Sequence, residues 1–309
     1  MNIQYIEPLS RGWQRMTKAL FQPFDLKKWF VVGFTAFLAG LTDFHGGGGS
    51  GGRGGVRFGW GDFFYFPERA WEWLVDNPFW FTLIVVGIFV AFLLAILFTW
   101  LSARGKFMFL DNVVHDRALV ANPWREYRVE GNSLFIWSFS FGLLVFAIFV
   151  VYVIACFSAL YGLHESSMET AVLIGPLILM ALGLFVILVL TGFVRLLLYD
   201  FVVPVMYKYR VTTLKALRIF LTPLASHFIY FLGYGLLMLI VYIVIFTGVV
   251  IAGLLTCCIG FILLIIPYIN AVVLLPISYT LRAWSVEFLE QFGPDYHVFP
   301  RAEAVQAGA

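Results

Sequence analysis

Charged residues are scarce in this 309-residue chain, because Asp, Glu, Lys and Arg together make up only 12% of it. An ordinary soluble domain contains about 25%. Hydrophobic residues make up 61%, more than a soluble core can absorb, so a lipid bilayer is the expected solvent. The 20 Lys and Arg nearly balance the 18 Asp and Glu. This balance gives no field that would attract nucleic acid, so nucleic acid is not expected as a partner.

Cysteine is also rare, and a cleavable signal is not recognisable. The three cysteines, Cys156, Cys257 and Cys258, all lie inside apolar runs. We therefore interpret them as small apolar helix residues and not as a disulfide or zinc framework. Residues 1–28 are polar and amphipathic, without an early apolar region or a cleavage site. The first membrane span is therefore expected to act as the insertion signal.

Long stretches without a formal charge predict most of the membrane spans. A bilayer core needs about 20 apolar residues per helix. Residues 77–103, 133–163 and 170–194 each provide one such stretch. Residues 219–281 form a fourth stretch of 63 residues, which is too long for one crossing. It fits two helices with an apolar turn near Ala252–Gly260, where Gly and Thr cluster, and the count is then five.

Trp29–Thr42 is the sixth candidate, and it has only 14 uncharged residues. A re-entrant segment is the alternative, although Lys27 and Lys28 can extend a short span by reaching to the interface. If it crosses, 17 of the 20 Lys and Arg lie on the side of both chain ends. Because basic residues favour the cytoplasmic side, this distribution favours six spans with cytoplasmic N- and C-termini, in the inner membrane.

The order of a basic amphipathic helix and two spans occurs three times. It predicts a single membrane domain, 1–309, built from three hairpin units and followed by a cytoplasmic tail, 283–309. The units cover approximately residues 9–103, 104–198 and 199–282. The fold class is therefore predicted to be an all-α membrane protein with six transmembrane helices and cytoplasmic interfacial helices.

The cytoplasmic segments 9–22, 104–128 and 200–221 interleave basic residues with aromatic and aliphatic ones. In the first of them, Trp13, Met16 and Leu20 recur at helical spacing. Such segments can lie flat on anionic headgroups, or they can pack on the spans and cap them. Both interpretations stay open at this point.

The external loop 43–77 begins with a glycine tract that predicts a flexible linker, since ten of residues 46–61 are Gly. Its match to GxGxxG at Gly49–Gly54 lacks the strand and helix that a dinucleotide site needs. After it, 67–78 predicts a short interfacial helix leading into the second span. Four interfacial tryptophans suit the headgroup boundary there, namely Trp60, Trp71, Trp73 and Trp80.

Acidic and basic residues are missing from the middle of every predicted span. This argues against a carrier built on a buried carboxylate and against intramembrane aspartyl or metalloprotease chemistry. Ser226, His227 and Ser158 lack a nucleophile motif, and the acidic turn 161–170 lacks the HExxH spacing of a zinc site. Neither a catalytic residue nor a metal or other cofactor is therefore predicted.

Two polar features remain as candidate sites. In the sixth span, Asn270 lies between Pro267 and Pro276, where it can line a substrate path or bond a neighbouring helix. The second feature is a cytoplasmic rim of cation and anion pairs at the end of each span pair. Salt bridges that tie the units together are the first interpretation, and an anionic-headgroup site is the alternative. The rim residues are Arg104, Asp111, Arg195, Asp200, Arg282 and Glu287.

Both ends of the chain resemble a family of uncharacterised bacterial membrane proteins. The resemblance is carried by SRGWQRMTKALFQPFDLKKWFVVGFTAFLAG at residues 10–40 and by LRAWSVEFLEQFGPDYHVF at residues 281–299. More distantly, the layout is similar to the membrane domain of some glycerophosphoryl diester phosphodiesterases. Their catalytic domain and acidic metal cluster have no counterpart here, so the resemblance implies topology and no activity.

We therefore predict a non-enzymatic membrane scaffold or complex subunit. Its expected partners are membrane lipids, other membrane proteins or a second copy of the chain. Small-residue faces such as Gly87/Ala91 and Gly248/Ala252 permit close helix contact. The alternatives are a permease or lipid-handling transporter with a cavity near the bent sixth span and, third, a membrane-embedded enzyme.

Overall fold

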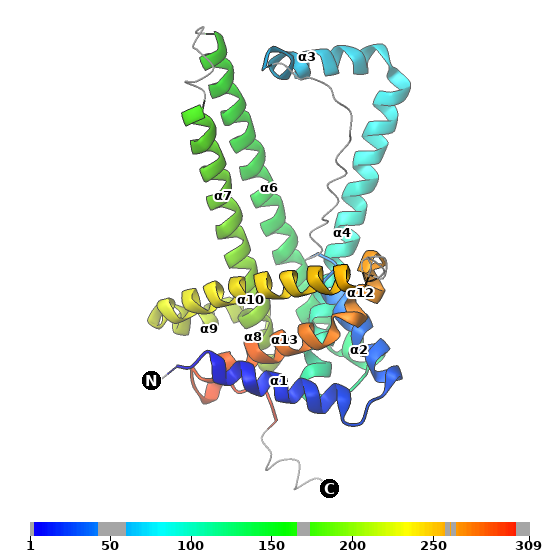
Figure 1. The fold of residues 1–309 in the computed structure, drawn as a ribbon, viewed down its shortest axis with the longest axis vertical. Coiled ribbons are helices and arrows are strands. Elements are labelled where there is room, and N and C mark those ends of the chain that lie inside the picture. The colour runs from blue at the N-terminus through cyan, green and yellow to red at the C-terminus, as the bar shows by residue number, and fades with distance from the viewer. Residues whose placement is uncertain (1–2, 43–59, 166–173, 257–259, 261–263, 301–309) are drawn as a thin grey trace. The chain divides into compact units, whose positions relative to one another are not determined.

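The computed structural model describes residues 3–42, 60–165, 174–256, 260 and 264–300. Every named element in these ranges is a helix, and no strand occurs among them (Figure 1). This confirms the all-helical fold class.

The chain divides into two compact units. The first contains residues 1–43, 100–138 and 189–309, and the second contains 44–99 and 139–188. The chain passes from one unit to the other inside three long helices, which continue through the boundaries. They are α4 (Pro78–His115), α6 (Arg128–Glu165) and α7 (Ile174–Leu197).

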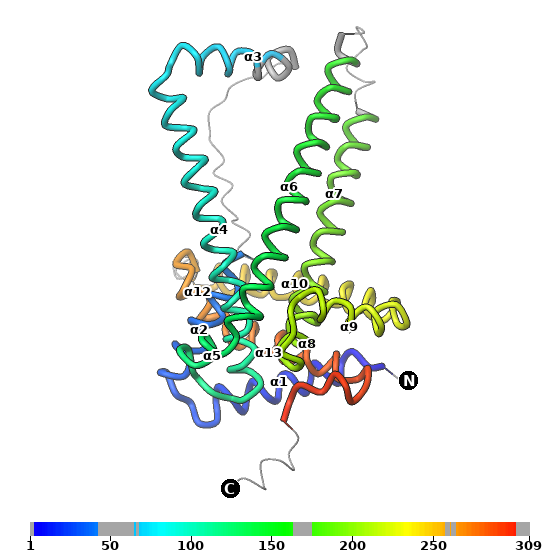
Figure 2. The backbone as a smooth tube through the Cα atoms, turned by 180° about the vertical axis from the view of Figure 1, so that it is seen from behind, coloured from blue at the N-terminus to red at the C-terminus, as the bar shows by residue number. Residues whose placement is uncertain are grey.

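The first unit holds most of the elements, and Figure 2 shows them from behind. Besides the ends of the three long helices, it contains α1 (Ile6–Phe21), α2 (Leu26–Ala39), α5 (Ala121–Glu126), the π-helix η2 (Leu198–Val202), α8 (Val203–Tyr209), α9 (Thr213–Ser226), α10 (Phe228–Leu255), α12 (Pro267–Val273), α13 (Leu275–Glu290) and the short 3-10 helix η3 (Pro294–Tyr296).

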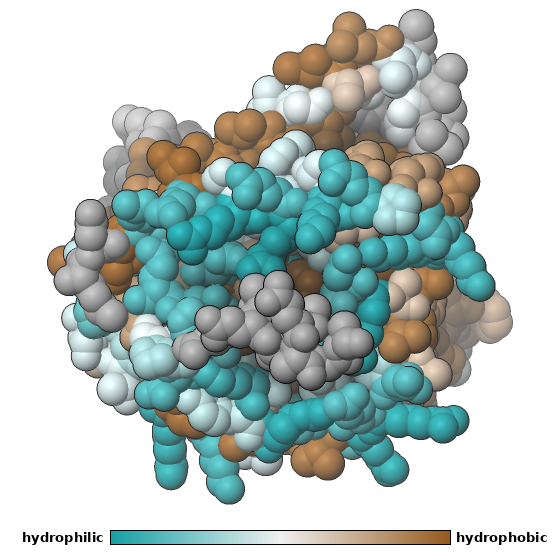
Figure 3. Space-filling model, turned by 90° about the horizontal axis from the view of Figure 1, so that it is seen from below, coloured by the Kyte–Doolittle hydropathy of each residue, from teal (hydrophilic) through white to brown (hydrophobic). Residues whose placement is uncertain are grey.

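The N-terminal helix α1 packs along the C-terminal helix α13 (Figure 1). The approach is close at Gly12, where an added Cβ would lie 3.0 Å from the Trp284 nitrogen. Of the predicted apolar positions, Met16 and Leu20 are buried and Trp13 is exposed. The first basic segment is therefore an amphipathic helix that packs its apolar face on the protein, as the capping interpretation expected. The face of this unit that carries α1 is mostly hydrophilic (Figure 3).

Aromatic rings form much of the core of this unit. The centre of the Phe201 ring lies 5.0 Å from that of Phe231 and 4.9 Å from that of Tyr234, and both pairs meet edge to face. Phe288 of α13 lies 4.8 Å from Tyr234, and all four side chains are buried. Aromatic pairs of this kind add to area burial, so they join η2, α10 and α13 firmly.

Four helical stretches are long and apolar enough to cross a membrane: Pro78–His115, Arg128–Gly162, Gly175–Tyr209 and Phe228–Leu255. A fifth exists if α12 and α13, which meet at a 65° bend, count as one span. The predicted turn after the fifth span agrees with the end of α10 at Leu255. The described residues therefore contain four to five helices of membrane-spanning length and composition, and the count of six stays a prediction.

Most of the segment predicted as the first span, Trp29–Thr42, lies in α2, which has 14 residues and ends at Ala39. At 1.5 Å per residue, a helix of this length covers about 21 Å, whereas a bilayer core is about 30 Å thick. Within the first unit, α2 packs against α12 and α13. It also touches α4, because Ser102 donates a hydrogen bond of 2.7 Å to the Ala39 carbonyl.

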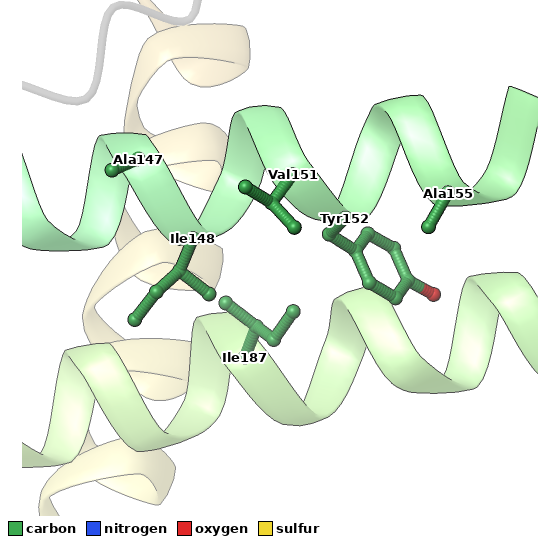
Figure 4. A pocket seen from close by; sticks show the side chains of 6 residues that line it. All are labelled: Ala147, Ile148, Val151, Tyr152, Ala155 and Ile187. Carbon is green, nitrogen blue, oxygen red and sulfur yellow. The ribbon is translucent and has the colours of Figure 1, made fainter.

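The second unit contains α3 (Trp60–Asp76) and parts of the three long helices. Here α6 and α7 lie side by side, joined where the Tyr152 hydroxyl donates a 2.5 Å bond to the Met180 carbonyl (Figures 1 and 4). The loop between them, 166–173, and the glycine tract lie outside the described residues. The helix predicted at 67–78 is present as the longer α3, which ends at Asp76.

Candidate functional site

The cytoplasmic rim predicted from the sequence lies entirely in the first unit. Five of its six residues are buried: Arg104, Asp111, Asp200, Arg282 and Glu287. The sixth, Arg195, is exposed at the end of α7. A buried charge is costly unless it is paired and hydrogen-bonded, so the partners of these five residues determine what the rim can do.

Asp111 has no exposed surface and is the best-satisfied carboxylate of the rim. Arg117 binds it through two nitrogens, with Nη2 at 2.8 Å and Nε at 3.0 Å. The Tyr207 and Tyr127 hydroxyls donate to its Oδ1 at 2.9 Å and 3.3 Å. Burial raises the pKa of Tyr127 to about 12, and repulsion between the Asp111 carboxylate and a phenolate adds to this, so the phenol remains a neutral donor.

Arg282 and Asp200 form a second buried pair, with Arg282 Nη1 4.0 Å from Asp200 Oδ1. The same nitrogen donates a 2.6 Å bond to the Tyr199 carbonyl, and the guanidinium lies 4.5 Å from the Tyr199 ring centre. Tyr234 of α10 donates to Asp200 Oδ2 at 3.0 Å. Asp200 lies in η2, so the wide π-helical turn presents both a carboxylate and a carbonyl to these neighbours.

Glu287 of α13 receives its cations from the other end of the chain. Arg15 Nε lies 2.6 Å from Glu287 Oε1, and Arg11 Nη1 lies 3.7 Å from Oε2. These ion pairs fix α1 on α13, so the first and last helices share one charged contact.

Arg104 is held by aromatic rings and an amide, without a carboxylate partner among the described residues. Its guanidinium lies 4.5 Å from the Trp100 ring centre and 4.8 Å from that of Trp124. Its Nη2 donates to Asn132 Oδ1 at 3.0 Å, and the side chain is 8% exposed. This is a fixed cation whose charge is not neutralised by the described protein.

No rim cation contacts the rim anion that follows it in the sequence. The spacings are seven residues for Arg104 and Asp111 and five residues for the other two pairs. On a helix, seven residues are two turns apart and five residues point to different faces. Each carboxylate is therefore satisfied by another element, and both members of the Arg282–Asp200 pair belong to the third predicted unit.

The substrate-path candidate, Asn270, lies in α12, and its side-chain oxygen is buried without a hydrogen-bond partner among the described residues. Pro267 begins α12 and Pro276 is the second residue of α13, so the prolines border the 65° bend. The predicted bent segment is present. The structure describes no bond from the Asn270 oxygen to a neighbouring helix.

The predicted interfacial tryptophans lie on α3 and at the start of α4. Trp71, Trp73 and Trp80 are exposed, as side chains at a headgroup boundary would be. Trp60 begins α3, and its side chain lies outside the described set. Among the described residues, no group of three His, Cys, Asp or Glu side chains could hold a metal ion.

A family model matches residues 5–289, which is nearly the whole chain and includes all six rim residues. The chain belongs to a family of unknown function, DUF7544. No curated protein and no solved structure matches it. Membership supports the resemblance to an uncharacterised family that both chain ends indicated, and it assigns no activity to the rim.

Proposed function

We propose that this chain is a non-enzymatic scaffold or complex subunit of the bacterial inner membrane, binding lipids and other membrane proteins. The proposed topology has six crossings in three hairpin units, with both termini in the cytoplasm. The arrangement of the long helices, the use of the rim charges and the packing of the chain ends each support a part of it.

The supporting observation is the exposure of the long apolar helices. In the most apolar stretch of α4 and of α7, no residue is buried by the rest of the chain, and in α6 and α10 only 6% are. A helix that is apolar on all sides needs a lipid or protein neighbour on every side. Lipid tails and the helices of partner proteins can both cover such surface, as a scaffold requires.

The chemistry of the rim also favours a structural role. Asp111 and Asp200 are each occupied by an arginine and by tyrosine, and Glu287 is occupied by two arginines, so all three hold separate elements together. A general acid or base must be free to exchange a proton with a substrate. These carboxylates are instead used in fixed internal contacts, which suits a rigid junction.

The packing of α1 on α13 supports placing both chain ends on one side. Two helices in contact through Gly12 and Trp284 must lie on the same side of the bilayer or in the same layer of it. If both helices lie on one side, the chain between them crosses an even number of times. Four crossings satisfy this condition. Six also satisfy it, if α2 and the bent α12–α13 pair both cross.

Two small-residue faces are free to receive partner helices. Gly87 and Ala91 of α4 are exposed, as are Gly248 and Ala252 of α10. An added Cβ at Gly87 or Gly248 would meet no atom within 4 Å. Such faces let another helix approach closely, so they are the expected contact points for a protein partner.

The test is the association of a Gly87→Leu/Gly248→Leu double variant in native lipid discs. Two differently tagged copies of the chain are co-expressed, and co-purifying membrane proteins are quantified by mass spectrometry. We expect the wild type to retain a stoichiometric membrane protein or a second copy. The double variant should lose at least 90% of that association, because the leucines prevent close helix contact.

Gly192→Leu is the matched control, because Gly192 is exposed, has the same open surroundings and has Leu188 and Leu196 one turn away. This variant should associate like the wild type. The proposal is contradicted if the wild type purifies with neither a second copy nor a stoichiometric partner. Unchanged association in the double variant would exclude these two faces.

A further inference from the structure

A pocket of about 460 Å³ opens where α4, α5 and the start of α6 meet. The described residues that line it are Arg104, Trp124, Arg125 and Arg128. Its size lies in the range of small-ligand sites, about 300–1,000 Å³. Three guanidinium groups around one opening are an unusual lining, because like charges repel one another unless an anion neutralises them.

The described residues provide no such anion. Arg117, Arg210 and Arg282 each have a carboxylate within 4.0 Å. None of the ion pairs among the described residues involves Arg104, Arg125 or Arg128, and Nε of the buried Arg104 has no hydrogen-bond partner. The fixed Arg104 and the exposed Arg125 and Arg128 therefore form a cationic site without a neutralising group among the described residues.

The inner cation is also pre-organised. Trp100 and Trp124 flank Arg104, and their rings meet edge to face with 5.5 Å between centres. Asn132 Oδ1 accepts bonds from both Trp100 Nε1, at 3.3 Å, and Arg104 Nη2, at 3.0 Å. The guanidinium is thus held in place before a ligand arrives, which lowers the entropic cost of binding.

The pocket lies where two apolar stretches end. In α4 the uncharged run 77–103 stops immediately before Arg104, and α6 begins at Arg128, shortly before its own uncharged run. The positive end of the α6 dipole adds to the field of the arginines. Trp100 and Trp124 are of the type that marks the headgroup layer of a membrane.

We propose that this pocket binds the phosphate of an anionic phospholipid headgroup. Guanidinium groups are opposite in charge to phosphate and can donate two parallel hydrogen bonds to its oxygens. The position of the pocket at the end of apolar stretches suits a headgroup whose acyl chains lie along the apolar helices. This inference rests on the proposed function only in requiring the chain to sit in a bilayer. It adds a defined lipid site to the general affinity for lipid.

The test uses the full chain in mild detergent, titrated with phosphatidic acid or with phosphatidylcholine of the same acyl chains and followed by native mass spectrometry. Arg125→Gln/Arg128→Gln removes two exposed pocket cations, so the fold is retained. Each basic residue near an anionic lipid contributes about fivefold to affinity, and the double variant should therefore bind phosphatidic acid about 25-fold more weakly. Inorganic phosphate serves as the competitor without acyl chains.

Lys215→Gln/Arg218→Gln is the control, since it removes two exposed cations from α9, a helix that supplies none of the residues lining the pocket. It should keep the wild-type affinity for phosphatidic acid within about twofold, as expected for charges outside the pocket. The proposal is overturned if the pocket variant binds as tightly as the wild type, if the control loses as much, or if phosphatidylcholine binds equally well. Displacement by equimolar inorganic phosphate would overturn the lipid assignment. The helix association measured with the glycine variants does not depend on any of these outcomes.

Discussion

Asp111 is a carboxylate with no exposed surface, and the side chains around it come from three separate segments. Asp111 itself lies in α4, Arg117 follows the end of that helix, Tyr127 lies between α5 and α6, and Tyr207 belongs to α8. A buried ion pair whose remaining lone pairs are all bonded fixes one arrangement of its neighbours. We infer that the contacts of Asp111 fix the end of α4 against the segments that contain Arg117, Tyr127 and Tyr207.

Asp111→Asn should therefore destabilise the protein. Asparagine keeps the shape of the side chain but leaves Arg117 without its counter-charge, and its NH2 group replaces one of the two oxygens that accept from Arg117 and Tyr207. Breaking a buried pair by changing one partner costs about 3 kcal/mol. We expect a clearly lower midpoint of thermal unfolding in detergent, measured by the loss of helical circular dichroism.

Asp116→Asn is the matched control. Asp116 pairs with Lys28 at the surface and has a positive φ of 51°, which asparagine tolerates. Exposed pairs contribute little, so its unfolding midpoint should match that of the wild type. Equal unfolding midpoints for both variants would contradict a stabilising role for the Asp111 contacts.

The sequence predicted where the rim charges lie but could not predict which of them pair. Asp111, Asp200 and Glu287 all follow apolar stretches, which is a local property of the chain. Their partners come from turns and distant helices, and Arg15 is 272 residues away from Glu287. Only the packing of helices decides such contacts, so spacing alone missed the roles of Arg117, Tyr127 and Tyr207.

The contact between α2 and α4 depends on a glycine. At Gly105 of α4, an added Cβ would lie 2.6 Å from the Ala39 nitrogen and 2.6 Å from the Leu38 carbonyl carbon. Both are backbone atoms, which cannot rotate away. Gly105→Ala should therefore separate the helices and destabilise the chain by about 1–3 kcal/mol, measured as a lower unfolding midpoint in detergent.

Gly192→Ala in α7 makes the same change where a Cβ would meet nothing within 4 Å. Alanine is the better helix former, so the midpoint should stay the same or rise slightly. A fall of equal size in both variants would show that the close approach of α2 is not the cause.

Helices were predictable wherever their apolar stretches were long. Residues 78–103, 133–163 and 174–194 of the uncharged runs lie in α4, α6 and α7, and the 63-residue run divides close to the expected turn. The exception is α2, since a run of 14 residues carries no information on whether it crosses or packs. The break between α12 and α13 was signalled by its two prolines.

For the molecule as a whole, the bias of Lys and Arg towards one side and the contact of α1 with α13 support the same topology. The first is a property of the sequence, and the second arises from Gly12, Arg15 and Glu287. Both support the part of the proposed topology that has the two chain ends on one side of the membrane, which requires an even number of crossings between them.

The most direct test of this topology is the accessibility of single cysteines in intact cells and in inverted membrane vesicles. Cysteines are introduced at the exposed positions Ser10, Glu72 and Asp295, after the native cysteines have been replaced. A membrane-impermeant maleimide should label positions 10 and 295 only in inverted vesicles and position 72 only in intact cells. Labelling of positions 10 and 295 from opposite sides would contradict the proposed topology.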